Sequence, residues 1–246
     1  MIRGLLSALA FMTTLPLPAT ASSQSKHTSA SVRAYPLVGL VLGLLLLSAF
    51  LLLSPLPPLV RAVLTVGLWL LLTGALHFDG FCDVADASFA SKTPGERQRI
   101  AKDAAIGSFA LAAGTVLLLS KVALLSHLEQ GAWLVVTLVL SRTTVTIPMA
   151  LHPVHRSSRL GRSARPRPRD LVVALLLGVG LSGLWSWFLI DLSHWLIALV
   201  SSSLATVLLA AWIAQRMEGL GGDAYGTLIE VAESVILLAA LAMGSR

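Results

Sequence analysis

Seven apolar runs, each close to the length that spans a bilayer, constrain this chain more than any other feature. About 20 helical residues cross the hydrocarbon core of a membrane. Only 12% of the 246 residues are charged and 56% are hydrophobic, whereas soluble domains carry roughly 25% charged residues. The chain is therefore expected to be all-α, a polytopic membrane helical bundle that forms a single domain over residues 1–246. The predicted spans are roughly 35–54, 59–78, 105–126, 132–151, 171–190, 194–214 and 226–243.

The first 18 residues form a shorter apolar segment, with Arg3 near its start. The small residues Ala19-Thr20-Ala21 that follow would also suit the cleavage site of a signal peptide. The alternative is an interfacial helix that lies at the membrane surface and belongs to the mature protein. Composition alone does not separate these two interpretations.

Positive charge is concentrated in one loop between the fourth and fifth predicted spans. Six arginines lie there: Arg156, Arg159, Arg162, Arg165, Arg167 and Arg169. The positive-inside rule places this loop in the cytoplasm, and alternation then places 79–104 and 219–226 on the same side. The loop contains no aromatic residue for base stacking, which argues against nucleic-acid binding. Attraction of anionic lipid or of a phosphorylated substrate is a secondary role for it.

Three carboxylates follow the second apolar run, at Asp79, Asp83 and Asp86. Their spacing of i, i+4 and i+7 places them on one face of a helix. Adjacent like charges repel, so a bound cation explains the cluster better than a solvated acidic helix end does. Oxygen ligands without a second His or Cys nearby predict Mg²⁺, with Mn²⁺ as the alternative. The cluster therefore predicts metal-dependent phosphate chemistry at a membrane surface.

Further charged residues interrupt the apolar sequence later in the chain. Asp223 and Glu230 are seven residues apart, so they share a helix face. With Asp103, they are candidates for a second metal ion or its outer shell. Charges within a span usually face a cavity or a partner. A buried ion pair of Arg142 with Glu230 or Glu233 is therefore the alternative, and it is compatible with a metal site.

Other candidate residues flank these carboxylates. Glycines in the loop 219–226, Gly222 and Gly226 among them, would let backbone N–H groups approach a phosphate. His77 precedes Asp79 by two residues and is either a catalytic base near neutral pH or a histidine at the membrane interface. Cys82 is better explained as a small packing residue than as a nucleophile.

Taken together, these motifs resemble the cobalamin synthase family, the adenosylcobinamide-GDP ribazoletransferases of the corrinoid pathway. The resemblance rests on Thr14-Leu15-Pro16, Tyr35-Pro36-Leu37-Val38-Gly39 with Gly43, the segment Thr73–Asp86, Lys102-Asp103 with Gly107, Ser141-Arg142, and Gly222-Asp223 with Gly226, Glu230 and Glu233. The chain departs from the family pattern at Thr14, Ala87, Lys102 and Glu218. None of these four positions is a predicted metal ligand.

The resemblance implies a transferase that joins adenosylcobinamide-GDP to α-ribazole, or to α-ribazole 5′-phosphate, and releases GMP. We expect Asp79, Asp83 and His77 to be catalytic, and Lys102 and Arg142 to neutralise phosphate oxygens. The resemblance also favours the interfacial N-terminal helix over a signal peptide. It implies an active site on the cytoplasmic face of a bacterial inner membrane. It leaves open a homo-oligomer or an association with other enzymes of the corrinoid pathway.

Two other functions agree with parts of the sequence. CDP-alcohol phosphotransferases also hold Mg²⁺ with aspartates at a membrane edge, but their Asp-Gly-x-x-Ala-Arg opening is not matched by Asp79-Gly80-Phe81-Cys82-Asp83-Val84. An ion-coupled transporter would use Glu230 and Glu233 as relay groups. Transporters of this kind are often built from internal repeats, and the sequence shows no convincing repeat.

Overall fold

The computed structural model describes residues 2–17, 28–89, 93, 96–97, 105–156 and 158–244. Within these ranges every regular element is a helix, and one isolated bridge joins Val154 to Leu220. Six helical segments are long and apolar enough to cross a membrane, and a bent pair of helices adds a seventh if it is counted as one span. The predicted all-α bundle of about seven spans is confirmed. The single domain over residues 1–246 stays a prediction.

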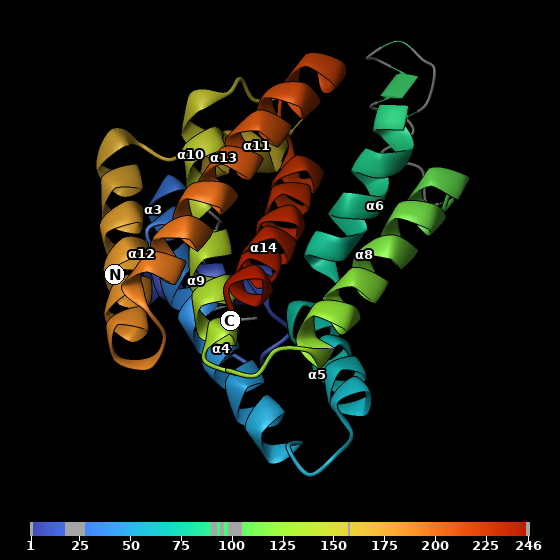
Figure 1. The fold of residues 1–246 in the computed structure, drawn as a ribbon. Helices are drawn as coiled ribbons and strands as arrows, with labels where there is room; N and C mark the ends of the chain where they lie inside the picture. The colour runs from blue at the N-terminus through green and yellow to red at the C-terminus, as the bar shows by residue number, and fades with distance from the viewer. Residues whose placement is uncertain are drawn as a thin grey trace.

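The helices run back and forth along the bundle (Figure 1). The segments of spanning length are α4 (Tyr35–Leu52), α5 (Pro58–Thr73) with α6 (Leu76–Phe89), α8 (Ser108–Ser126), α9 (Trp133–Thr144) with α10 (Thr146–Leu151), α12 (Pro168–Leu189), α13 (Leu192–Met217) and α14 (Gly222–Gly244). Three shorter helices are α1 (Ile2–Met12), α3 (Ser29–Val32) and α11 (Arg159–Ala164).

Two of the spans form the centre of the bundle. The span made by α9 and α10 is 83% buried and α14 is 72% buried, whereas the other unbroken spans are 22–44% buried. Every residue of α9 is buried, including the polar residues Thr137, Ser141 and Arg142. In Figure 1, α14 lies between α13 and the pair formed by α6 and α8. The central position of α14 matters for the site, because this helix carries four of the predicted site residues, Gly222, Asp223, Gly226 and Glu230.

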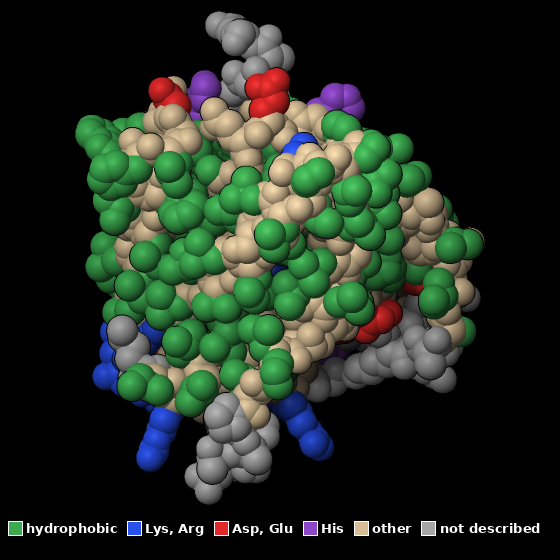
Figure 2. Space-filling model, turned by 90° about the horizontal axis from the view of Figure 1, so that it is seen from below, with side chains coloured by type: hydrophobic (Ala, Val, Ile, Leu, Met, Phe, Trp, Pro, Cys, Tyr) green, Lys and Arg blue, Asp and Glu red, His purple; other side chains and the backbone are tan. Residues whose placement is uncertain are grey.

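The outer surface is largely apolar. Leu71, Leu176 and Val200 are more than 60% exposed on their helices, which suits contact with lipid rather than water. Hydrophobic side chains cover most of the face seen in Figure 2, and Lys and Arg side chains project from its lower edge.

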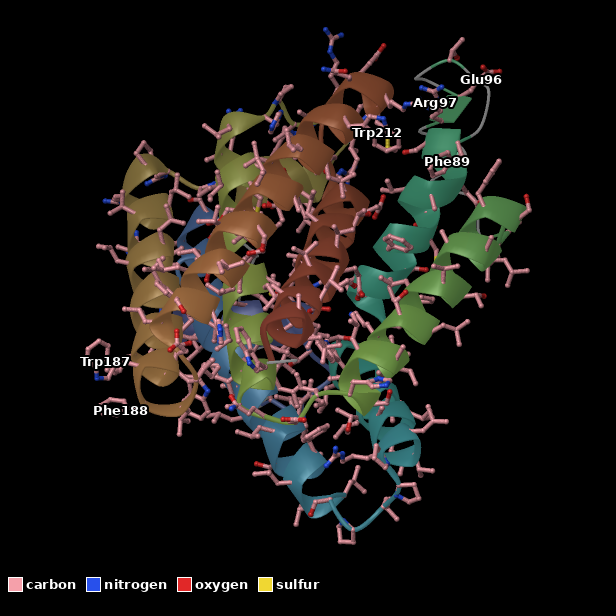
Figure 3. All side chains as sticks on the ribbon, in the orientation of Figure 1. Phe89, Glu96, Arg97, Trp187, Phe188 and Trp212 are labelled. Atoms are coloured by element: carbon pink, nitrogen blue, oxygen red, sulfur yellow. The ribbon has the colours of Figure 1, made fainter. Side chains whose placement is uncertain are left out.

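Aromatic residues lie at both ends of the bundle. Phe89 and Trp212 lie near each other at one end, with their ring centroids 6.0 Å apart (Figure 3). Trp187 and Phe188 lie at the far end of α12 and are 69% and 73% exposed. Aromatic side chains at two levels are typical of the two interfaces between a membrane and water.

The predicted span over 59–78 is not a single straight helix, and in this detail the prediction is wrong. Helix α5 ends at Thr73, and α6 starts at Leu76 with its axis turned by 91°. Gly74 and Ala75 make the turn with φ angles of 60° and 54°, a left-handed conformation that glycine adopts at little cost. Hydropathy indicates how long an apolar run is, but it does not register such a turn.

The N-terminal segment supports this turn. The hydroxyl of Thr14 donates to the carbonyl of Leu71 at 2.7 Å, and its N–H donates to the carbonyl of Leu72 at 2.8 Å. These carbonyls lie at the C-terminal end of α5, where a helix leaves acceptors without intrahelical partners. Helix α1 packs against α3 and α4, so the predicted N-terminal helix is confirmed as part of the fold. Residues 19–21 lie outside the described ranges.

Glycines allow α4 and α9 to pack with their backbones in close contact. A Cβ atom on Gly39 would lie 2.3 Å from the carbonyl oxygen of Leu138, and one on Gly43 would lie 2.8 Å from Cα of Val135. Small residues at such crossings let helices in a membrane approach closely. The segment that resembles the family motif after Tyr35 therefore has a packing role here.

We predict that Gly39→Ala destabilises the protein by about 1–3 kcal/mol, because the added methyl group would meet backbone atoms that cannot turn aside. Thermal unfolding in detergent would measure the loss. Gly67→Ala is the matched control, since a Cβ there meets nothing within 4 Å, and it should be neutral or slightly stabilising. Equal melting temperatures for Gly39→Ala and the wild type would contradict the packing role.

Candidate active site

The site forms where α6 and α14 cross with their backbones nearly in contact. A Cβ atom on Gly80 would lie 2.8 Å from the carbonyl oxygen of Asp223, and one on Gly226 would lie 3.1 Å from Cα of His77. The hydroxyl of Thr227 bridges the crossing by donating to the carbonyls of Gly80 and Asp223. The crossing therefore brings together two sequence motifs that are more than 140 residues apart.

A cavity of about 110 Å³ lies at this crossing. Its walls include five of the residues predicted from the sequence: His77, Asp79, Gly222, Asp223 and Gly226. Side chains from α1, α4 and α11, and that of Val145 between α9 and α10, also line it. The space has room for several water molecules, so a group of the size of a phosphate fits within it.

Four carboxylates influence one another beside this cavity. Asp79, Asp223 and Asp86 all act electrostatically on Asp83. In the described part of the chain, no group of three or more His, Cys, Asp or Glu side chains is arranged to hold a metal ion. Mg²⁺ does not require such a cage, because it usually binds one or two carboxylates together with water and substrate phosphates. The repulsion and the oxygen-only donors therefore fit a magnesium ion that arrives with its substrate.

Asp86 has a structural role that the sequence analysis missed. One of its carboxylate oxygens accepts the N–H of Gly107 at 2.7 Å, and the other accepts the N–H of Ala110 at 2.8 Å. These N–H groups belong to the first turn of α8, so Asp86 caps that helix from a different element. Because Asp86 lies far from α8 in the sequence, no local sequence pattern indicates this cap. That Asp86 binds a metal stays a prediction.

A cluster of buried charges lies at the next turns of α14. Lys121 Nζ is 2.5 Å from both the Glu230 and the Glu233 carboxylates, and Arg142 forms an ion pair with Glu233. All four side chains belong to residues that are at most 4% exposed. The predicted ion pair of Arg142 is confirmed, with Glu233 as its partner. Lys121, which like Arg142 is a charge within an apolar run, belongs to the same network of buried ion pairs.

His77 connects this cluster to the cavity. Its Nδ1 is 3.4 Å from Nη2 of Arg142. Arginine can only donate, so Nδ1 is the acceptor and the proton of the neutral ring is on Nε2. In this arrangement His77 is better placed to donate a hydrogen bond than to act as a base. The catalytic role of His77 stays a prediction.

The remaining predicted residues have different outcomes. Lys102 and Asp103 lie outside the described residues. Gly222 lies at the start of α14, where a Cβ atom would meet the side chain of Leu160 in α11 at 3.0 Å. Cys82 is half-buried, and its thiol donates to the carbonyl of Ala110 at 3.8 Å. This contact agrees with the predicted packing role.

The sequence matches the family described as cobalamin-5-phosphate synthase, CobS, over residues 4–241. The chain belongs to this family. A cobalamin synthase relative from Deinococcus radiodurans, an adenosylcobinamide-GDP ribazoletransferase, is 43% identical over 94% of this chain and 82% of its own length. Proteins with the same description from Desulfitobacterium hafniense and Pseudomonas aeruginosa are 34% and 35% identical, each over 97% of this chain and 96% or 97% of their own lengths. No solved structure matches the chain.

Membership of the cobalamin synthase family confirms the resemblance proposed from the sequence motifs. The chain is a multi-span membrane transferase of cobalamin biosynthesis, and its relatives are bacterial.

We predict that Lys121→Ala lowers the free energy of unfolding by about 3–5 kcal/mol, because it removes the cation between two buried carboxylates. Tryptophan fluorescence during thermal or denaturant unfolding in detergent would measure this loss. The double variant Lys121→Met with Glu230→Gln removes one charge of each sign and leaves Arg142 paired with Glu233. It should regain much of the stability, and a double variant as unstable as Lys121→Ala would contradict the charge-pairing explanation.

Proposed function

We propose that this chain is an adenosylcobinamide-GDP ribazoletransferase, which joins adenosylcobinamide-GDP to α-ribazole or its 5′-phosphate and releases GMP. The match over residues 4–241 and the descriptions of its relatives support this reaction. The structural observation that carries the proposal is the cavity between α6 and α14. It brings Asp79 and Asp223, which are far apart in the sequence, to one site, and Asp83 lies close enough to both to be influenced by their charges.

The reaction exchanges one bond to phosphorus for another. A hydroxyl oxygen of the ribazole forms a bond to the phosphorus on the cobinamide side of the diphosphate. The bond from that phosphorus to the bridging oxygen breaks, GMP leaves with the bonding electrons, and the attacking hydroxyl loses its proton. Such transfers depend mainly on positioning and on neutralising phosphate charge. This chemistry needs two kinds of group: carboxylates that bind a cation, and buried hydrogen-bond donors.

Asp79, Asp83 and Asp223 are the residues that would hold Mg²⁺, with Mn²⁺ as the alternative. When bound, the ion would neutralise the diphosphate and stabilise the leaving GMP. We leave Asp86 in a supporting role because it already caps α8. Glu230 is likewise engaged, since it pairs with Lys121. Its negative charge would act on the site from a distance rather than as a ligand.

The donors of the site have separate tasks. His77 lines the cavity, and its Nε2 proton would be donated to a phosphate oxygen. Arg142 fixes the orientation of the His77 ring through its contact with Nδ1. Lys102 and Asp103 keep the roles proposed from the sequence, as a phosphate-neutralising cation and an additional carboxylate.

We propose that the site lies at the cytoplasmic face of a bacterial inner membrane. The arginine loop contains α11, and Leu160 and Ala164 of this helix line the cavity. The cavity therefore opens at the end of the bundle that carries the most basic loop, which the positive-inside rule places in the cytoplasm.

We predict that Asp79→Asn and Asp83→Asn each reduce GMP release by at least about a hundredfold, because each removes a negative charge that the metal would need. The measurement is GMP release by purified protein in liposomes, supplied with adenosylcobinamide-GDP and α-ribazole 5′-phosphate. Asp191→Asn is the matched control, since Asp191 caps the N-terminus of α13 and asparagine also caps well.

EDTA should abolish release by the wild type, and added Mg²⁺ should restore it. Near-normal release by either the Asp79 or the Asp83 variant would contradict the metal assignment. No release by the folded wild type would contradict the proposed reaction.

A further inference from the structure

The cavity contains a hydrogen-bond donor that the proposed metal chemistry does not use. The phenol oxygen of Tyr225 is buried and has no hydrogen-bond partner in the described part of the chain. The residue is only 7% exposed, and it lines the same cavity as Asp79 and Asp223. Buried hydroxyl groups are nearly always hydrogen-bonded. An unpaired one in the wall of a cavity indicates a ligand that supplies the missing acceptor.

The position of Tyr225 in α14 points to an anionic ligand. It lies in the first turn of this helix of 23 residues, and Gly222 at the start of the helix also lines the cavity. The first N–H groups of a helix lack intrahelical acceptors, and the helix dipole makes this end partly positive. Phosphate groups bind at such helix ends.

A cation from the arginine loop adds positive charge to this side of the cavity. The guanidinium of Arg165 acts electrostatically on the phenol of Tyr225. It is held there by a hydrogen bond from Nη2 to the carbonyl of Ala150 at 3.1 Å. Arg165 directly follows Ala164, which lines the cavity. The loop whose charge sets the topology of the chain thus also delivers positive charge to the site.

We propose that Tyr225 and Arg165, with the N-terminus of α14, form a subsite for a phosphate group of a substrate. The inference deepens the proposed transferase function and rests on it. Asp79 and Asp223 offer only acceptors to the cavity, so an anion bound there needs donors from other residues, and Tyr225 supplies one. The cavity of about 110 Å³ has room for a phosphate. The bound group is either the diphosphate of adenosylcobinamide-GDP or the 5′-phosphate of the acceptor.

Tyr225→Phe is the decisive variant because it removes the hydroxyl and leaves the ring in place. We expect a rise of about tenfold or more in the KM of one phosphorylated substrate, the effect of losing a hydrogen bond to a charged oxygen. Arg165→Gln should raise the same KM. Arg167→Gln is the matched control, since Arg167 is an exposed arginine of the same loop, whereas Arg165 is the arginine that acts on Tyr225.

A comparison of α-ribazole with α-ribazole 5′-phosphate as the second substrate identifies which phosphate is bound at Tyr225. A raised KM for α-ribazole 5′-phosphate, with unchanged kinetics for α-ribazole, would place the acceptor phosphate at Tyr225. A raised KM for adenosylcobinamide-GDP with either acceptor would place the diphosphate there. Unchanged KM values for both substrates in the Tyr225 variant would overturn the subsite, even if the wild type turns over normally.

A binding measurement separates this inference from the proposed reaction. Inorganic phosphate and pyrophosphate, in the presence of EDTA, should raise the melting temperature of the wild type in detergent. Tyr225→Phe should lose most of this shift, whereas Arg167→Gln should keep it. Such a result would support the subsite even if no GMP were released. No shift in the wild type with either anion, or an equal shift in the Tyr225 variant, would overturn it.

Discussion

Paired charges in the middle of the bundle fix how the central helices are arranged. Lys121 on α8 pairs with Glu230 and Glu233 on α14, and Arg142 on α9 pairs with Glu233. Charges in an apolar interior are costly unless they are paired, so these three helices have one favourable register. Arg142 extends the cluster to His77 on α6. Because His77 also lines the cavity, the arrangement that satisfies the buried charges also sets a wall of the site.

The glycines of the two main motifs act first through packing. Gly80 on α6 and Gly226 on α14 leave no room for a side chain at the crossing of these helices. Gly226 is predicted from the sequence to bind phosphate, and in the structure it lies in the cavity wall and at a backbone contact. The two roles agree, since the close crossing brings the Asp223 end of α14 next to Asp79.

Composition and spacing were enough to predict most of the spans, the charged interior and five of the residues that line the cavity. These features follow from burial of apolar surface and from the cost of isolated charge, which a sequence displays directly. What the sequence did not reveal depends on contacts between distant elements. The cap of Asp86 on α8, the pairing of Lys121 and the unpaired phenol of Tyr225 each need a partner or a cavity that only the fold supplies.

The break in the second span shows how local geometry serves the site. A straight helix from Pro58 to Phe89 would be about 48 Å long at about 1.5 Å per residue, whereas the apolar core of a bilayer is about 30 Å thick. The turn at Gly74 and Ala75 redirects the chain, so that α6 packs against α8 and α14 and holds its carboxylates beside the cavity. Thr14 binds the carbonyls exposed by this turn. The N-terminal segment therefore helps to hold α6 in position, although its sequence carries none of the predicted chemistry.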